Sequence, residues 1–273
     1  MTQPIILDSI THMKAEHRGR AVLAGSHGGA YAAYYAAKMG VGAVILNDAG
    51  IGREQAGLAG VKMLGGLGVP AAAIAHTSAR IGDGADGMAR GVLSYVNAVA
   101  AGHGLAVGMP AAGALALLAA ASLTPSAAPP ALDELRFAIP EASRPGARVV
   151  GADSVTLVKP EDAGQIFVNG SHGGILGGRP ETAIKVDVFA AVYNDAGIGI
   201  DQAGLTRLPH LDERAIAGAC VACFSARIGD GRSTWQDGFI SAINDTALRY
   251  GGAVGQSCKE FVAAMVAARL AAR

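Results

Sequence analysis

The sequence contains few cysteines and few aromatic residues and has no excess of charge, and each of these features excludes some classes of protein. It has 3 cysteines in 273 residues and only 5% aromatic residues. A low and odd number of cysteines argues against a disulfide-bonded secreted domain and favours reduced thiols in a cytoplasm. Lys and Arg equal Asp and Glu at 22 each, so no net charge attracts nucleic acid or an anionic membrane. We therefore expect a small-molecule ligand, no nucleic-acid partner and no membrane partner.

The chain also lacks a signal-peptide pattern and a long apolar run. No basic region followed by an apolar stretch and a cleavage site stands at its beginning. The apolar stretch at 111–123 is shorter than the roughly 20 residues that a bilayer span needs. These features predict a cytoplasmic protein, and they leave a homo-oligomer open.

Glycine and small apolar residues are abundant. Hydrophobic residues make up 51% of the chain, charged residues make up 16%, and there are 39 glycines. This composition is typical of α/β proteins with parallel sheets, whose strands are buried on both faces. A disordered or fibrous chain is disfavoured.

The most informative feature is an internal repeat. Three glycine-rich motifs each occur twice: GSHGG at 25–29 and 170–174, NDAGIG at 47–52 and 194–199, and SARIGDG at 78–84 and 225–231. The offset is 145 residues for the first motif and 147 for the other two, so the copies are collinear. We predict two tandem α/β repeats, at 1–123 and 148–273, related by a pseudo-twofold axis. A Pro- and Ala-rich linker at 124–147 joins them.

Each motif follows a short apolar run without alternation, which is typical of a strand in a parallel sheet. The runs lie at 20–24, 42–46 and 69–76 in the first repeat and at 165–169, 188–193 and 217–224 in the second. Ala-rich segments between them supply crossover helices. Each repeat is therefore predicted to be a mostly parallel sheet flanked by helices. Ligands bind beyond the carboxyl ends of such strands, where all the motifs fall.

The GSHGG motifs place a histidine beside glycine amides at a strand end. His27 and His172 are candidate general bases, acids or hydrogen-bond donors, and the glycine amides can stabilise an oxyanion. The structural alternative is a tight turn in which the histidine bonds to backbone, but the recurrence of the motif favours a site. Ser26 is not a ready nucleophile for His27, because neighbours on an extended segment point in opposite directions.

The other two motifs offer carboxylates and guanidinium groups. Asp48 and Asp195 could orient an imidazole or activate water, although the same sequence is good turn and helix-cap chemistry, and both roles stay open. Arg80 and Arg227 could clamp a carboxylate with two hydrogen bonds. Pairing with the Asp three residues later in the same loop is favoured.

We predict His27, Asp48, His172 and Asp195 as catalytic residues and other motif residues as ligand contacts. These contacts are Gly25, Ser26, Gly28, Asn47, Ser78, Arg80 and Asp83, with Gly170, Ser171, Gly173, Asn194, Ser225, Arg227 and Asp230 in the second repeat. No GxxxxGK[ST] or HExxH pattern occurs and no GxGxxG follows a first strand, so neither a cofactor nor a metal is expected. Cys220 and Cys223 form a lone CxxC in an apolar run, which favours core cysteines. A pair of Cys223 with His172 is a weaker alternative.

The order of the motifs resembles the caspase and hemoglobinase fold, especially its bacterial CHAT branch. Val22–Gly28 resembles the histidine motif of that family, and Val44–Gly52 resembles its cysteine motif. The resemblance implies a nucleophilic Cys at the end of the second strand, but Ala49 and Ala196 stand at that position. It therefore implies either water activation by His and Asp or a catalytically silent fold.

Three functions are open. The favoured one is a hydrolase of a small amide, lactam or ester, in which His and Asp transfer protons and the glycine amides stabilise an oxyanion. The second is a catalytically silent, caspase-like binding or scaffold protein. The third is a cofactor-free isomerase or lyase that uses the same residues.

Overall fold

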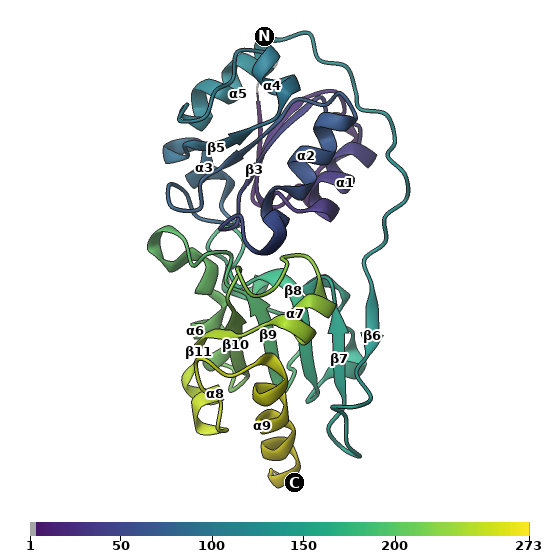
Figure 1. The fold of residues 1–273 in the computed structure, drawn as a ribbon, viewed down its shortest axis with the longest axis vertical. Coiled ribbons are helices and arrows are strands. Elements are labelled where there is room, and N and C mark those ends of the chain that lie inside the picture. Colours follow the sequence, from purple (N-terminus) through teal and green to yellow (C-terminus); the bar gives the residue numbers. More distant parts are fainter. Residues whose placement is uncertain (1–3, 273) are drawn as a thin grey trace.

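The computed structural model describes residues 4–272, which form two α/β units stacked end to end (Figure 1). The first three residues of the predicted first repeat and the last residue of the second lie outside the described residues. The linker runs along one side of the molecule from the first unit to the second (Figure 1). Within residues 4–272, no helix combines the length and the apolarity that crossing a membrane requires.

The first repeat is a five-stranded sheet in the order β1-β2-β3-β4-β5, with β1 to β4 parallel and β5 antiparallel. Its strands are β1 (Ile5–Leu7), β2 (Ala21–His27), β3 (Ala43–Asn47), β4 (Ala71–Ile74) and β5 (Leu93–Val96). Its helices are α1 (Ala30–Lys38), α2 (Ala59–Gly66), α3 (Gly84–Arg90), α4 (Ala98–Gly102) and α5 (Ala111–Ala120). The three predicted strands correspond to β2, β3 and β4.

The second repeat is a six-stranded sheet in the order β11-β10-β9-β8-β7-β6, with β7 to β10 parallel and both edge strands antiparallel. Its strands are β6 (Arg136–Ala138), β7 (Val149–Ala152), β8 (Ile166–His172), β9 (Ala190–Asn194), β10 (Ala217–Val221) and β11 (Ile240–Ile243). Its α-helices are α6 (Arg207–Asp212), α7 (Gly231–Asp237), α8 (Asp245–Arg249) and α9 (Cys258–Ala271). Strand β6 pairs with β7, so this sheet begins inside the segment predicted as linker.

The crossovers of the two repeats differ after the GSHGG motif. Helix α1 follows the motif in the first repeat, whereas the second has only the short 3₁₀ helix η6 (Pro180–Thr182) before β9. Gly177 and Gly178 have φ of +56° and +68°, outside the right-handed helical region. Pro180 lacks the amide hydrogen that a helix interior needs. These residues prevent a second copy of α1.

The sheet of the first repeat is covered by apolar side chains on both faces. Val22 and Val44 pack on the side of α1 and α2, whereas Leu23 and Ile45 pack on the side of α5. Successive side chains of a strand point to opposite faces, so a strand covered on both sides needs an unbroken apolar run. This arrangement explains the runs in the sequence and confirms the predicted fold class.

The repeats meet through the loops at the carboxyl ends of their strands, and the contacts come in matched pairs. The amide of Arg53 donates to the carbonyl of Cys223 at 2.8 Å, and the amide of Ile200 donates to the carbonyl of His76 at 2.9 Å. Both residues of the second pair are offset by 147 from those of the first, as a pseudo-twofold axis requires. An apolar cluster between the repeats takes three residues from each: Ala49, Ala56, Ile81, Ala196, Ala203 and Ile228.

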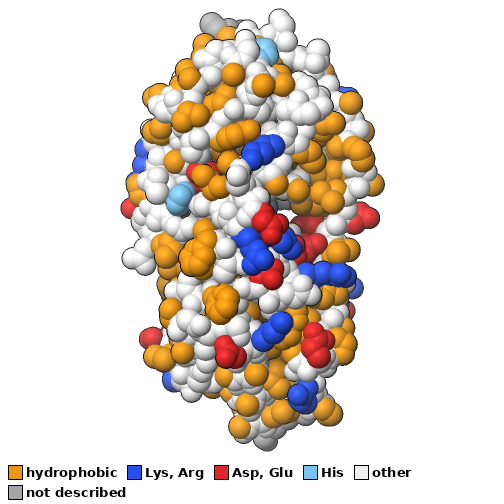
Figure 2. Space-filling model, in the orientation of Figure 1, with side chains coloured by type: hydrophobic (Ala, Val, Ile, Leu, Met, Phe, Trp, Pro, Cys, Tyr) orange, Lys and Arg blue, Asp and Glu red, His pale blue; other side chains and the backbone are white. Residues whose placement is uncertain are grey.

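Ion pairs surround this boundary. Arg80 Nη2 lies 2.9 Å from Asp201 Oδ2, and Arg227 Nη1 lies 3.2 Å from Glu54 Oε1, so each arginine reaches the other repeat. Acidic and basic side chains gather at the boundary on the face drawn in Figure 2. Pairs this exposed contribute about 1 kcal/mol or less each to stability, and their main effect is on orientation.

Candidate functional site

Both motif histidines end a strand and accept a hydrogen bond from a glycine amide. His27 ends β2, and its Nδ1 accepts from the amide of Gly29 at 3.1 Å. His172 ends β8, and its Nδ1 accepts from the amide of Gly174 at 3.2 Å. A neutral imidazole carries one proton, so in both rings the proton lies on Nε2. The backbone-bonded turn is therefore present, and it leaves Nε2 free to donate.

The two histidine rings face each other across the boundary between the repeats. Their centroids are 6.4 Å apart and the ring planes meet at 76°, an edge-to-face arrangement. The ring of His27 lies next to Gly229 of the second repeat, and that of His172 lies next to Gly82 of the first. The fold thus brings the two predicted histidines into one site.

Burial keeps both histidines neutral. It lowers the pKa of His27 to about 4. It also lowers the pKa of His172 well below its ordinary value, and the nearby Arg207 and His27 act in the same direction. Neutral rings with an occupied Nδ1 and a protonated Nε2 can donate hydrogen bonds, but they have no free lone pair that could accept a proton.

The histidines line a cavity of about 120 Å³, which we call the histidine cavity. Ser26 and Ser171 also line it, and their hydroxyls accept the backbone amides of Ile10 and Val155, each at 2.9 Å. A space of this size holds a few water molecules or one small polar group. Because residues of both repeats and of the linker line the cavity, it exists only in the assembled chain.

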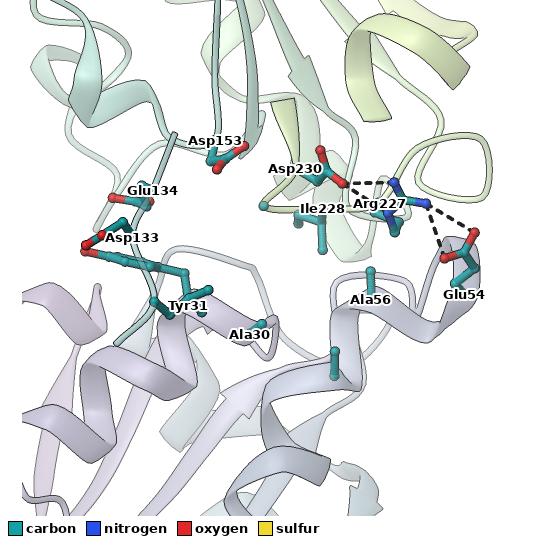
Figure 3. Close-up of a pocket in the computed structure, with 13 residues that line it drawn as sticks. Ala30, Tyr31, Glu54, Ala56, Asp133, Glu134, Asp153, Arg227, Ile228 and Asp230 are labelled. Carbon is teal, nitrogen blue, oxygen red and sulfur yellow. Dashed lines mark hydrogen bonds and ion pairs between the residues drawn. The ribbon is translucent and has the colours of Figure 1, made fainter. Parts of the chain in front are cut away.

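A second space of about 360 Å³, which we call the linker cleft, adjoins the histidine cavity. The two share Tyr31, Glu134, Asp153 and Gly229 in their walls. Figure 3 shows Tyr31 and Glu134 at one end of the linker cleft and Arg227 at the other. The linker segment 132–134 forms part of the wall, so it contributes to the site as well as joining the repeats.

Glu134 titrates near neutrality. Burial, together with the nearby charge of Asp153, raises its pKa to about 7, although hydrogen bonds with Ser154 and Tyr31 act in the opposite direction. A carboxyl group with a pKa near the working pH is suited to proton transfer. No sequence pattern marks Glu134, because it lies in the linker, outside every repeated motif.

The two motif aspartates lie apart from the histidine cavity. Asp48 Oδ1 lies 2.8 Å from Nδ1 of His76, and its Oδ2 accepts from the hydroxyl of Ser94 at 2.8 Å. Burial opposes ionisation of Asp48, but the hydrogen bonds from His76 and Ser94 outweigh it and lower the pKa. Asp195 Oδ1 accepts the amides of Cys223 and Gly197, each at 2.9 Å. Neither aspartate lines the cavity.

The cysteines are buried and free of disulfide bonds. Burial, with a smaller contribution from Asp195, raises the pKa of Cys223 to about 12. Burial likewise raises the pKa of Cys258 to about 12 and that of Cys220 further still. All three thiols are protonated near neutral pH, which agrees with core cysteines and leaves none activated for attack.

Four further motif residues tie the loops together. Asn47 donates to the carbonyl of the second residue of the adjacent SARIGDG loop at 3.2 Å, and Asn194 makes the equivalent bond at 3.1 Å. Ser78 and Ser225 each donate to the carbonyl three residues earlier, at 2.9 and 2.7 Å. Their polar groups serve the backbone of the boundary loops.

The motif glycines permit close approaches of backbone to backbone. A Cβ on Gly25 would lie 2.4 Å from the amide nitrogen of Asp83, and one on Gly170 would lie 2.4 Å from that of Asp230. Gly28 and Gly173 are equally confined, because a Cβ would meet a carbonyl oxygen at 2.5 and 2.3 Å. A side chain would force these loops apart.

The SARIGDG loops carry caps and ion pairs. Asp83 and Asp230 are the N-caps of α3 and α7, where their side chains accept a backbone amide. Arg227 pairs with Asp230 at 3.0 Å, as predicted, whereas Arg80 lies 3.9 Å from Asp83. The shortest ion pair of Arg80 crosses to the other repeat instead.

The NDAGIG loops hold residues in a strained backbone conformation. Ala49, Ile51, Glu54 and Gln55 have φ between +49° and +61°, and the second repeat has the same pattern at 196, 198, 201 and 202. Such a conformation is costly for residues with a side chain and persists only where the surroundings hold it. The surroundings here are the other repeat, since a Cβ on Gly50 would lie 2.7 Å from the Cα of Gly197.

Within residues 4–272, no three His, Cys, Asp or Glu side chains gather closely enough to hold a metal ion. Comparison with known proteins finds no match among family models, curated sequences or solved structures. The resemblance to the caspase and hemoglobinase fold therefore stays a prediction.

Proposed function

We propose that this chain is an enzyme that hydrolyses an amide, lactam or ester of a small polar molecule in the histidine cavity. One observation carries the proposal: two neutral imidazole donors, one from each repeat, converge on a cavity that also contains a carboxyl group with a pKa near 7. Packing alone does not require two imidazoles and a carboxyl group here. Apolar side chains would fill the same space without the free-energy cost of burying polar groups.

The histidines supply the electrophilic half of the reaction. The Nε2–H groups of His27 and His172 donate to the carbonyl oxygen of the substrate and stabilise the oxyanion that forms when the carbonyl is attacked. Fixed donors in a site shielded from water act strongly on developing charge. A neutral imidazole is a suitable donor because it carries no charge before the reaction begins. In this proposal the histidines donate hydrogen bonds and do not act as bases.

Glu134 supplies the proton transfers. Its carboxylate takes a proton from a water molecule, which attacks the carbonyl carbon and forms a tetrahedral intermediate. The resulting carboxylic acid returns the proton to the leaving nitrogen or oxygen as the bond to carbon breaks. A pKa of about 7 suits both steps at neutral pH. Asp48 and Asp195 shape the boundary loops and take no part in the chemistry.

The proposal is tested with a panel of small amides, lactams and esters. We expect Glu134→Gln to lower kcat on the substrate found by about 100-fold or more, because general base catalysis contributes at least that much. His27→Asn and His172→Asn keep an acceptor near the Nδ1 position but lose the Nε2–H donor. We expect each to lower kcat by about 100-fold. In the wild type, kcat/KM rises with pH through about 7, since Glu134 must be ionised to accept the proton.

Two matched variants serve as controls. Glu161→Gln changes a side chain that is 54% exposed, and His210→Asn changes a histidine on α6 outside the cavity. Both are expected to keep wild-type kcat. An unchanged kcat in Glu134→Gln and in both histidine variants would contradict the proposal and favour a binding or scaffold protein. If the panel yields no substrate but the same residues are required for an isomerisation, hydrolysis is wrong and the site assignment stands.

A further inference from the structure

Arg207 is a buried cation at the wall of the histidine cavity. It is the first residue of α6 and is 2% exposed. Its Nε donates to the carbonyl of His172 at 3.1 Å, and its Nη1 donates to the carbonyls of Thr182 and Ala183. The ring of Tyr193 lies 5.2 Å from the guanidinium carbon. These contacts fix the guanidinium in one place.

Among the described residues, the charge of Arg207 has no counter-ion. No described carboxylate lies within 4.0 Å of it, and within residues 4–272 no acceptor bonds to Nη2. Among the described residues, Arg136 Nε is the only buried side-chain nitrogen or oxygen without a partner, so Nη2 reaches accessible space. Carbonyl groups satisfy N–H donors but do not neutralise a cation, and an unpaired buried charge is costly. An anion from outside the chain would provide the missing charge.

We propose that the histidine cavity binds a carboxylate group of the substrate, with Arg207 as its counter-ion. The catalytic use of this carboxylate rests on the proposed hydrolysis. The substrate class is then an amide, lactam or ester that carries a carboxylate within a few bonds of the carbonyl. Nη2 offers a carboxylate oxygen a charged hydrogen-bond donor, since Nε and Nη1 already bond to carbonyl groups, and the small cavity suits a group of that size.

The repeats are unequal at this position. The counterpart of Arg207 under the 147-residue offset is Gly60, and a Cβ on Gly60 would lie 2.3 Å from the carbonyl oxygen of Gly29. The first repeat thus has neither the cation nor the room for one. The two histidines are related by pseudo-symmetry, but the cation lies on one side only. The cavity therefore binds one carboxylate per chain.

The walls of the linker cleft limit the charge of the ligand. Arg227 is paired there with Glu54 and Asp230. The carboxyl groups that line the cleft belong to Glu54, Asp133, Glu134, Asp153 and Asp230. Two of these groups, Glu134 and Asp153, also line the histidine cavity, so the single cation Arg207 balances one anionic group there. The excess of negative charge repels a second anionic group on the ligand, so monoanions bind more tightly than dianions.

The test is calorimetric titration of the full-length protein at constant ionic strength with propionate, propionamide, succinate and inorganic phosphate. Propionate is expected to bind with one site per chain. Its uncharged isostere propionamide is expected to bind about tenfold more weakly or worse, because hydrogen bonds between charged groups are roughly twice as strong. Succinate and phosphate are expected to bind more weakly than propionate. Hydrolysis is not needed for this readout.

Variants of Arg207 test whether propionate binding depends on the charge of its guanidinium group. Arg207→Gln is expected to weaken propionate about 30-fold or more, as removal of one partner of a buried charge pair does, and Arg207→Lys is expected to weaken it less. Arg144→Lys is the control, since that guanidinium also donates to backbone carbonyls but lies outside the cavity. If Arg207→Gln does not fold, the comparison of propionate with propionamide in the wild type still tests whether the cavity selects a carboxylate.

Three results would overturn the inference. They are equal affinity for propionate and propionamide, tighter binding of phosphate than of propionate, and unchanged propionate binding in a folded Arg207→Gln variant. Hydrolysis of neutral amides without propionate binding would reject this inference and leave the proposed function. Propionate binding without any hydrolysis would reject the proposed function and leave this inference.

Discussion

The two nitrogens of each motif histidine have separate roles. Nδ1 accepts a glycine amide and shapes the turn after the strand, whereas Nε2 carries the ring proton of a side chain that lines the histidine cavity. His27 and His172 therefore meet a structural demand through Nδ1 and, in the proposed function, a chemical one through Nε2. The GSHGG motif can form a backbone-bonded turn and also supply a hydrogen-bond donor, because the two roles use different atoms of the same ring.

The depressed pKa values of the histidines predict a loss of stability in acid. The unfolded chain binds protons on these rings below about pH 6.5. The folded chain does not bind one on His27 until about pH 4, and on His172 the pKa is also lowered. The contribution of these two rings to the free energy of unfolding therefore falls as the pH falls through this window, whereas the raised pKa of Glu134 contributes with the opposite sign. Each ring adds a slope that approaches about 1.4 kcal/mol per pH unit.

Urea denaturation between pH 7.5 and pH 4.5 checks this prediction. The double variant His27→Asn, His172→Asn is expected to show a shallower dependence on pH than the wild type. His210→Asn is expected to keep the wild-type slope, because its side chain lies outside the buried site. Equal slopes in the wild type and the double variant would mean that the two rings are protonated in the folded chain.

The strand-end loops are the elements that hold the repeats together. Their glycines allow backbone contacts that no other residue permits, and their left-handed residues are repeated in both units. Because these loops are needed to pack the two repeats together, the recurrence of a motif is weaker evidence for catalysis than the sequence alone suggests. The convergence of the histidines on one cavity is the stronger evidence.

Substitution of the loop glycines is expected to destabilise the protein strongly. Gly25→Ala and Gly170→Ala each place a Cβ 2.4 Å from a backbone nitrogen, so the loops must move. We expect a loss of about 2 kcal/mol or more in the free energy of unfolding for each, by the overpacking mechanism. Gly113→Ala is the control in α5, where a Cβ meets nothing within 4 Å, and it is expected to stabilise by about 0.5–1 kcal/mol. Chemical denaturation measures all three, and equal effects would contradict the packing argument.

Local patterns in the sequence predict the elements well, and non-local packing explains what they miss. The repeat and the buried parallel strands follow from apolar runs and motif spacing, which are local. The partner of Asp48 does not, because His76 lies in the loop that follows the neighbouring strand β4, 28 residues away. Glu134 and Arg207 carry no repeated pattern, so only the fold brings them to the cavity.

At the scale of the whole molecule, two similar repeats build one asymmetric site. The pseudo-twofold axis relates the histidines and the boundary contacts, but Arg207 and the linker residue Glu134 have no equivalents on the other side. The histidine cavity between the units is formed only when both are present. In the proposed function, the duplication therefore produces one site per chain, in place of two independent sites.

The central claim is that both repeats act on one ligand, and a crystal structure of the protein with propionate tests it most directly. We predict one propionate per chain in the histidine cavity. Its carboxylate should lie within about 3 Å of Nη2 of Arg207, inside the cavity that His27 and His172 line. Propionate bound in two separate clefts, one in each repeat, or bound away from His27 and His172 would contradict the account.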